Sequence, residues 1–208
     1  MSHYFSNDDT APLQRRHVFA TIWGRELEFT TAGGVFSTGG LDLGTAVLLR
    51  TYPPPTRMPR ILDLGCGWGP IAVGIAVLCP DVLVDAIDVN DRALALCAEN
   101  AAANGVTDRV RTLRPEDVDP GARYDEIWSN PPIRIGNDAL HALLLTWLPR
   151  LAEDGAAKLV VGRNLGADTL QRWLVHQGYE CERAASAKGF RVLEVSRASS
   201  GALAREER

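Results

Sequence analysis

The sequence predicts an α/β protein with a doubly wound, mostly parallel seven-stranded sheet and an antiparallel last strand. Two observations predict it. From residue 60 onward, short apolar runs alternate with helical segments, the order in which parallel strands are joined by crossover helices. At the end, the runs 179–186 and 190–197 are separated only by "AKG", so no helix fits between them and they are expected to pair antiparallel.

The other elements of this sheet follow from short apolar runs and from helical spacing. The strand-like runs are rich in Val, Ile and Leu, and between most of them apolar residues recur every three to four positions. Strands are expected at 60–65, 82–88, 110–113, 124–129 and 157–162, and helices at 69–79, 91–104, 138–152 and 167–177.

A smaller element precedes the sheet. Two β-rich runs, 17–23 and 26–31, are joined by Gly24-Arg25, which predicts a two-residue hairpin. After the glycine-rich loop "GGVFSTGG", the segment 41–52 has apolar residues at helical spacing until the prolines of "PPP" end it.

Three regions are therefore expected. Residues 1–40 form an N-terminal extension whose hairpin packs on the same domain, residues 41–197 form the α/β domain, and residues 198–208 form a flexible tail of small and charged residues.

Composition limits the class of protein. The 208 residues are 46% hydrophobic, enough for a sizeable core, but no apolar run reaches the roughly 18–20 residues of a membrane helix, and the N-terminus lacks the order of a secretion signal. The four cysteines show neither C-x-x-C nor His partners at metal spacing, so we expect reduced thiols, a cytoplasmic protein and no metal. A net charge of −4 argues against a general nucleic-acid coat, though not against a local basic patch. The oligomeric state stays open.

A glycine-rich turn marks the expected ligand site. In "ILDLGCGWGP", Gly65, Gly67 and Gly69 stand between a buried strand and a helix, where doubly wound sheets bind ligands. A dinucleotide fingerprint starting at Gly65 would need a third glycine at position 70, which is Pro70. The proline removes an N–H that pyrophosphate would use, so NAD is disfavoured.

Acidic residues lie at or just after the carboxyl ends of three of the strands. Asp63 precedes the glycine turn, where it would repel a pyrophosphate and attract an ammonium group. It can also tie down the loop by hydrogen bonds, and both roles can hold together. Asp88 ends the second strand and suits the two hydroxyls of a ribose better than Asp85, which lies further from the carboxyl end. Asp117 follows the third strand and is either a partner for an adenine amino group or a solvated loop acid.

These residues resemble class I S-adenosylmethionine-dependent methyltransferases, a Rossmann-like fold, over residues 41–197. "DLGCGWG" with a downstream "DVN" carries the resemblance. The chemistry agrees, because a sulfonium cofactor without phosphates is bound better by acidic residues than by a phosphate-binding loop. The resemblance implies that the glycines line the nucleoside and methionine parts and that Asp88 holds the ribose. The cofactor residues expected here are Asp63, Gly65, Cys66, Gly67, Gly69, Asp88, Val89, Asp117 and Asn130.

The stretch "SNPPI" ends the fourth strand, and in the resembled fold this end lies beside the methyl donor. N-P-P followed by a bulky residue is similar to the motif of enzymes that methylate planar nitrogens, which makes Asn130, Pro131, Pro132 and Ile133 the expected catalytic residues. The Asn130 side chain and the Pro131 carbonyl would each accept one N–H of the target amine, and the prolines offer no competing donor. Taken alone, the motif is also a strand-ending turn. Many members of this wider group have Tyr or Phe where this chain has Ile133.

A second resemblance narrows the target. "HYFS", "GVFSTGGLDLGT", "NPPI" and "KGFRVLEV" look like the catalytic domain of the guanine-N2 methyltransferases of small-subunit ribosomal RNA, in a single-domain form. The resemblance implies that the cofactor is covered by Phe36, Ser37, Asp42, Gly44 and Thr45. It also implies ribosomal RNA or the small ribosomal subunit as the partner. Taken by itself, "GVFSTGG" could equally pack Val35 and Phe36 into the core. Basic candidates for substrate contact are Arg134, which follows "NPPI" directly, and Lys188.

Two other functions compete with this one. The acidic charge and Ile133 favour a small molecule or a protein glutamine as methyl acceptor. A non-catalytic binding module is the more distant alternative, since a complete cofactor turn together with Asn130 is hard to explain without group transfer.

Overall fold

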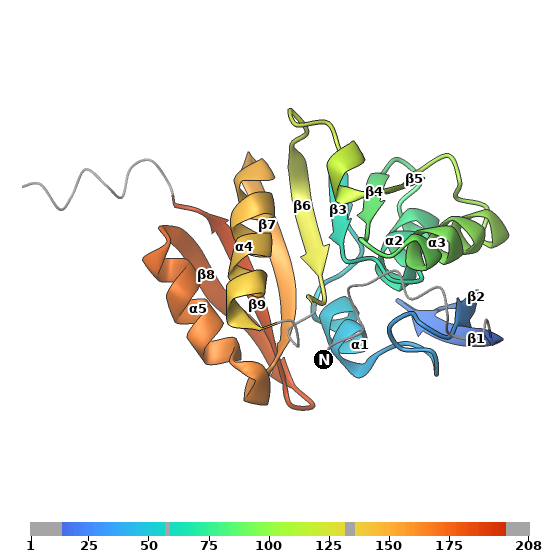
Figure 1. The fold of residues 1–208 in the computed structure, drawn as a ribbon, viewed down its shortest axis with the longest axis horizontal. Helices are drawn as coiled ribbons and strands as arrows, with labels where there is room; N and C mark the ends of the chain where they lie inside the picture. The colour runs from blue at the N-terminus through green and yellow to red at the C-terminus, as the bar shows by residue number, and fades with distance from the viewer. Residues whose placement is uncertain (1–13, 57–58, 132–135, 199–208) are drawn as a thin grey trace, which may run out of the picture.

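Nine strands form a hairpin and one large sheet in the computed structural model, which describes residues 14–56, 59–131 and 136–198 (Figure 1). The strands are β1 (Arg15–Ile22), β2 (Arg25–Ala32), β3 (Arg60–Leu64), β4 (Leu83–Ile87), β5 (Val110–Leu113), β6 (Tyr124–Ser129), β7 (Leu151–Gly162), β8 (Tyr179–Ala187) and β9 (Phe190–Arg197). The hairpin pairs β1 with β2, and the sheet has the order β5-β4-β3-β6-β7-β9-β8.

Five α-helices accompany the strands in the described part of the chain. They are α1 (Leu43–Thr51), α2 (Pro70–Leu78), α3 (Asp91–Ala103), α4 (Asn137–Trp147) and α5 (Ala167–His176), with short 3-10 helices at Pro115–Asp117, Leu148–Arg150 and Arg163–Leu165. Helix α1 lies between the hairpin and β3, and the other four α-helices lie between strands that run in the same direction. None of the helices in the described ranges is long and apolar enough to cross a membrane.

The expected sheet is confirmed, including its antiparallel end. β3, β4, β5, β6 and β7 run parallel, whereas β9 is antiparallel to both of its neighbours, β7 and β8. The expected helix over 138–152 ends earlier, because Pro149 stands in a 3-10 turn and β7 already begins at Leu151, which pairs with Tyr124. Strand β7 is therefore longer than the apolar run 157–162 predicts.

The hairpin turn lies one residue earlier than predicted. Ile22 pairs with Arg25, so the turn residues are Trp23 and Gly24, both with positive φ (44° and 80°). A tryptophan is unusual in this conformation, and sequence propensity therefore disfavours it. Its indole N–H donates to the Tyr52 carbonyl at 2.8 Å, and its ring meets Trp128 edge to face, which offsets the strain.

The two faces of the sheet carry separate cores. Alternation along β3 sends Ile61 into the core shared with α1, α2, α3 and the hairpin, and Leu62 into the core shared with α4 and α5. The same alternation along β6 puts Trp128 on the α1 side and Ile127 on the other. The next residue with the Trp128 orientation is Asn130, so the register of β6 directs this side chain toward α1. All four cysteines are buried and free.

A buried asparagine fixes the hairpin to the sheet domain. Asn100 of α3 receives the Thr30 N–H (2.7 Å) and donates to the carbonyls of Thr30 (2.9 Å) and Trp68 (2.7 Å). The Asn100 side chain thus provides hydrogen-bond partners for backbone groups both at the edge of β2 and at the end of the glycine turn. The hairpin shares the core of the α1 side, and the boundary at residue 40 stays a prediction.

Replacing Asn100 by Leu should lower the free energy of unfolding by about 3 kcal/mol, because it leaves a buried N–H and two carbonyls without partners. Asn104 provides the matched control, since it bonds the neighbouring Glu28 carbonyl from a half-buried position at the C-terminal cap of the same helix. Asn104→Ala should cost less than about 1 kcal/mol in the same urea titration. Equal losses for the two variants would contradict the proposed role of Asn100.

Candidate functional site

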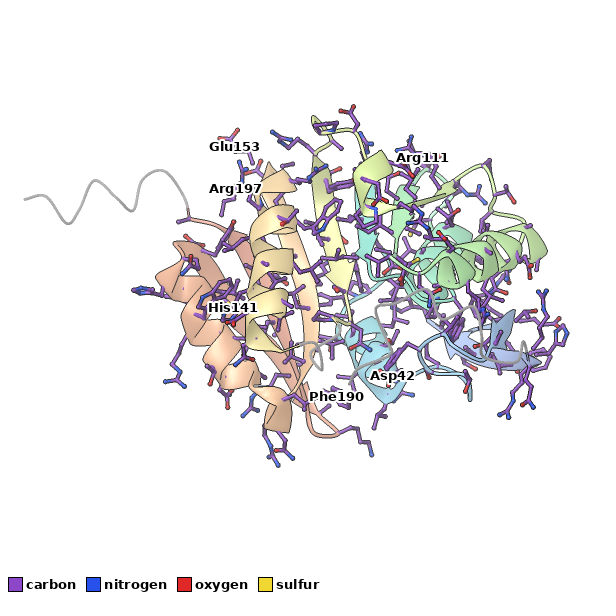
Figure 2. The ribbon with its side chains drawn as sticks, viewed as in Figure 1. Asp42, Arg111, His141, Glu153, Phe190 and Arg197 are labelled. Carbon is purple, nitrogen blue, oxygen red and sulfur yellow. The ribbon has the colours of Figure 1, made fainter. Side chains whose placement is uncertain are left out.

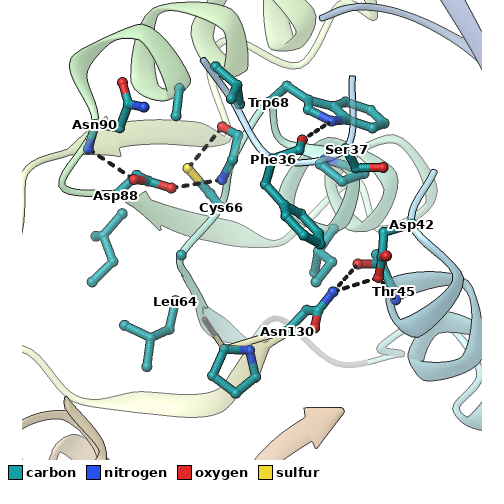
Figure 3. Close-up of a pocket in the computed structure, with 18 of the residues that line it drawn as sticks. Phe36, Ser37, Asp42, Thr45, Leu64, Cys66, Trp68, Asp88, Asn90 and Asn130 are labelled. Atoms are coloured by element: carbon teal, nitrogen blue, oxygen red, sulfur yellow. Dashed lines mark hydrogen bonds between the residues drawn. The ribbon is translucent and has the colours of Figure 1, made fainter. Parts of the chain in front are cut away.

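The carboxyl ends of β3, β4 and β6 open into a cavity of about 380 Å³ (Figure 3). Its walls are largely apolar and include Leu64, Ile87 and Ala93, and its polar groups come from the ends of the strands and from the loop before α1. The position agrees with the rule that ligands of open α/β sheets bind outside the carboxyl ends of the strands.

The glycine turn forms one wall of this cavity. The N–H groups of Gly65 and Cys66 both donate to the Ile87 carbonyl at 2.9 Å, which fixes the turn against the end of β4. Gly65 and Gly67 have φ of 79° and 56° and line the cavity. A Cβ on Gly69 would lie 2.6 Å from the Cys97 sulfur, so this glycine permits the close approach of α3. The missing third glycine at position 70 is therefore no obstacle to tight packing here.

Asp88 is the acid that reaches the cavity from β4. Its carboxylate accepts the N–H groups of Gly67 (3.0 Å) and Asn90 (2.9 Å), which point it across the glycine turn. Burial raises the pKa of Asp88, and the backbone N–H groups act in the opposite direction. Each carboxylate oxygen keeps a free acceptor position for a hydroxyl. Asp85 lies elsewhere, buried and bound to Arg60, Arg111 and Tyr124.

The loop before α1 forms the opposite wall. Val35 is buried in the core, as one interpretation of "GVFSTGG" expects, but Phe36 is 50% exposed and lines the cavity. The Phe36 carbonyl accepts the indole N–H of Trp68 at 3.1 Å, which ties this loop to the glycine turn. Ser37 holds the loop in shape with φ of 59° and a hydroxyl that donates to the Gly40 carbonyl at 2.6 Å.

Asn130 is oriented by two side chains of the α1 segment (Figure 3). Its Nδ2 donates to Asp42 Oδ2 at 2.7 Å and to Thr45 Oγ1 at 3.1 Å. Because a carboxylate only accepts hydrogen bonds, this contact assigns the amide nitrogen to the α1 side. The amide oxygen Oδ1 is then the acceptor that Asn130 can offer to a ligand. Asp42 also caps α1 by accepting the Thr45 N–H at 3.1 Å.

The structure brings many of the expected residues together around the cavity and leaves others outside it. The expected residues that line it are Phe36, Ser37, Asp42, Thr45, Gly65, Cys66, Gly67, Asp88, Val89, Asn130 and Pro131. Those not among the lining residues are Gly44, Asp63, Gly69, Asp117 and Lys188. Pro132, Ile133 and Arg134 lie outside the described residues.

The residues outside the lining have visible structural settings. Asp117 is exposed in the 3-10 helix after β5, whereas its neighbour Pro115 lines the cavity. Lys188 is exposed in the turn between β8 and β9. A Cβ on Gly44 would lie 2.9 Å from the Phe190 ring, so this glycine lets that ring approach α1.

Phe190 is the main site residue that sequence reasoning missed. It lines the cavity together with Gly162, its partner in the β7–β9 register, and with Leu165. "KGFRVLEV" contains Phe190, but only the pairing of β9 beside β7 brings it to the site. Asn90, in "DVN", was also missed as a lining residue; it caps α3 and donates to the Gly34 carbonyl at 3.0 Å.

Asp63 is buried under the glycine turn. Its Oδ2 accepts the Ala72 N–H of α2 at 3.0 Å, which is the loop-fixing role expected for it. Oδ1 has no hydrogen-bond partner among the described residues. Burial without a neutralising partner raises the pKa of Asp63 to about 7, while the Ala72 bond acts to lower it.

The architecture and the cavity define a class I methyltransferase-type fold, and solved structures agree. The 16S rRNA N2 G1207 methyltransferase RsmC of T. thermophilus, solved with AdoMet and guanosine, matches with a TM-score of 0.78 at 24% identity, over 90% of this chain and 51% of that chain. A TehB-like SAM-dependent methyltransferase from Corynebacterium glutamicum matches with a TM-score of 0.59 at 19% identity, over 77% and 91% of the two chains.

Sequence comparison gives the family: residues 26–194 match the Methyltransferase small domain, and the chain belongs to this family. The YbxB protein of Bacillus subtilis is 29% identical over 94% of this chain and 98% of its own length. Ribosomal RNA small subunit methyltransferase C of Vibrio vulnificus is 38% identical over 59% of this chain, and that of Shewanella loihica 33% over 76%. The matched regions span only 35% and 46% of those two relatives.

The chain is thus an S-adenosylmethionine-dependent methyltransferase, and its cavity fits that cofactor. Asp88 offers carboxylate acceptors for the ribose hydroxyls, and the apolar residues beside it, Ile87 and Val89, suit the adenosine. Among the described residues, N–H groups of the glycine turn are already bonded, that of Gly67 to Asp88 and those of Gly65 and Cys66 to the Ile87 carbonyl, which disfavours a pyrophosphate. A compact, acid-lined and mostly apolar cavity of this kind suits a nucleoside carrying a positive charge better than one carrying phosphates.

Replacing Asp63 by Asn should flatten the dependence of stability on pH. The folded pKa of about 7 lies above the ordinary aspartate pKa of 3.8, so between these two values the folded chain keeps a proton that the unfolded chain releases. The free energy of unfolding of the parent should therefore fall as pH rises from about 4 to about 7, by a few kcal/mol. Urea titrations across this range should show a smaller fall for Asp63→Asn. Asp81→Asn, at an exposed site, makes the same charge change and should retain the parent slope.

Proposed function

We propose that this methyltransferase acts on an exocyclic amino nitrogen, namely N2 of guanine in ribosomal RNA of the small subunit. The observation that carries the proposal is the orientation of Asn130. Asp42 and Thr45 hold its amide nitrogen, and its Oδ1 is left as a hydrogen-bond acceptor beside the cavity.

An amino group on a ring is a poor nucleophile, because its lone pair is delocalised into the ring. Oδ1 of Asn130 accepts one N–H of this amine, and the carbonyl of Pro131 accepts the other. With both hydrogens held, the lone pair turns out of the ring plane, and the positive charge that grows on nitrogen is stabilised by two fixed dipoles. Pro131 and Pro132 have no N–H, so the chain beside these acceptors offers no donor that would compete for them.

When bound, the cofactor would supply a methyl group on a sulfonium. The acceptor nitrogen would form a bond to this methyl carbon as the carbon–sulfur bond broke with its electron pair on sulfur, and the nitrogen would then lose a proton to water. The protein residues align the acceptor nitrogen and exclude water from the apolar part of the cavity. Alignment of reactants in a rigid site can supply on the order of 7–11 kcal/mol of the barrier reduction. No metal-binding side chains are required for this role.

The relatives support ribosomal RNA as the substrate class. The two curated relatives above are named for the small ribosomal subunit, and the RsmC structure was solved with guanosine. A small molecule or a protein glutamine is the second candidate, because the matched regions span less than half of the named relatives and the net charge is −4. Incubation with labelled cofactor and either ribosomal subunits, ribosomal RNA or a cell extract freed of RNA distinguishes these acceptors.

Asn130→Ala should lower the rate of methyl transfer about 100-fold, because it removes a dipole that acts on the charge developing at nitrogen. Cofactor affinity, measured by titration calorimetry, should change far less than the rate. Asn137→Ala, at an exposed residue in the first turn of α4, serves as the control and should transfer methyl at the parent rate. An Asn130→Ala protein as fast as the parent would refute the assigned chemistry.

Asp42 is the positioning residue for Asn130, and two variants separate this role from helix capping. Asp42→Ala loses both functions and should lower the free energy of unfolding by about 1 kcal/mol. Asp42→Ser keeps a capping hydroxyl but is too short to hold the amide, so its stability should stay near the parent value. We expect both variants to transfer methyl about tenfold more slowly, since the amide can rotate. Parent-like turnover by Asp42→Ser would contradict the positioning role.

A further inference from the structure

One corner of the molecule carries an excess of basic residues beside the cavity. It consists of residues 163–172, from the 3-10 helix after β7 into α5, and residues 183–191, the β8–β9 turn with its flanks. The Arg163 N–H donates to the Gly189 carbonyl at 2.8 Å, which joins the two segments. We call these two segments the basic corner.

The charge of the basic corner is opposite to that of the whole chain. Its charged residues are Arg163, Asp168, Arg172, Arg183, Lys188 and Arg191, five basic and one acidic, in a chain of net charge −4. Asp168 is already engaged, since its carboxylate accepts from Arg183 at 2.7 Å and from Arg191 at 2.7 Å. The side chains of Arg163 and Lys188 are exposed, and neither forms an ion pair with a described residue.

The basic corner is continuous with the cavity. Gly162, directly before Arg163, lines the cavity, and so do Leu165 and Phe190. Figure 2 shows Phe190 at the same end of the sheet as Asp42, away from Arg111, Glu153 and Arg197 at the opposite end. Leu165 is 48% exposed, so the cavity wall on this side is apolar and open to solvent.

We propose that the basic corner is the surface that holds a single RNA strand, with Arg163 and Lys188 contacting phosphates and Phe190 stacking on the acceptor base. The inference rests on the proposed function and adds to it the binding surface and the base-contacting residue. An unpaired or flipped-out base is implied, because a base inside a duplex cannot reach the end of a cavity of this kind.

The chemistry of the corner suits this partner. Backbone phosphates supply a large part of the affinity of nucleic acids for proteins, and the exposed cations Arg163 and Lys188 beside the cavity can contact them without a positive net charge on the whole chain. Aromatic rings stack on bases of any sequence. Ile133 offers no ring after the double proline, and Phe190 supplies one from a different strand.

The test uses the full chain and a labelled single-stranded RNA of about 12 nucleotides, with binding followed by fluorescence anisotropy from 50 to 200 mM salt. Arg163→Gln/Lys188→Gln should bind about tenfold more weakly at low salt. For single strands each phosphate contact contributes about 0.7 to the slope of log affinity against log salt, so the slope should fall by about 1.4.

Arg123→Gln/Arg197→Gln is the matched control, since it removes two exposed arginines, one just before β6 and the other at the end of β9, away from the cavity. It should retain the parent affinity and slope. Equal losses for the two double variants would overturn the proposal. Failure of the parent to bind the RNA at all would overturn it as well.

Phe190→Ala should lower methylation of RNA about tenfold with unchanged cofactor affinity, and Phe190→Tyr should restore it. If the parent methylates RNA, and the Arg163→Gln/Lys188→Gln and Phe190→Ala variants bind and methylate RNA as well as the parent does, the proposed role of the basic corner is refuted. The proposed function then still stands. A parent that binds RNA through the corner but methylates none of it refutes the proposed function instead.

Discussion

The hydrogen bond from Asn130 Nδ2 to Asp42 Oδ2 is the contact on which the site depends. It joins residues 88 positions apart, at 2.7 Å, and the same carboxylate oxygen caps α1. The beginning of α1 and the end of β6 therefore have one shared anchor. If the amide were free to rotate, it would present a donor as readily as an acceptor, whereas the amino group proposed as substrate needs only acceptors. The fold thus fixes the orientation of the Asn130 amide, with its nitrogen toward α1 and its oxygen available as an acceptor.

The anchor works only because the register of β6 and the position of α1 are themselves fixed. Alternation puts Glu126, Trp128 and Asn130 on the α1 face of the sheet. There Lys158 of β7 pairs with Glu126 at 2.8 Å and lies over the ring of Trp128 at 4.5 Å. A slip of one residue would send this whole set, including Asn130, to the opposite face. A largely buried ion pair and two aromatic contacts to Trp128, from Trp23 and Tyr52, make such a slip costly.

The sequence predicts what depends on local pattern and misses what depends on distant pairing. Alternating runs predict the sheet and its antiparallel end, and the glycine turn and "NPPI" predict the cavity, since strand ends meet at one edge of a parallel sheet. Phe190 was missed because it joins the site only through its pairing with Gly162. The turn at Trp23 was misplaced because a contact with Tyr52, 29 residues away, overrides the local preference. The spacing of residues in the sequence likewise does not predict the hydrogen bond between Asp42 and Asn130.

The distribution of charge gives the site two different ends. Asp42 and Asp88 line the cavity, where carboxylates favour a cationic cofactor and repel phosphate. The basic corner stands at the Phe190 side of the same cavity, so a polyanion attracted there would be kept away from the cofactor cleft by the acids inside it. With RNA as the proposed substrate, the phosphates would be held outside the cavity and only the uncharged base would enter, where its ring meets apolar walls. A net charge of −4 is therefore compatible with RNA as substrate, since the sign of the local field, not the total, decides which part of the substrate goes where.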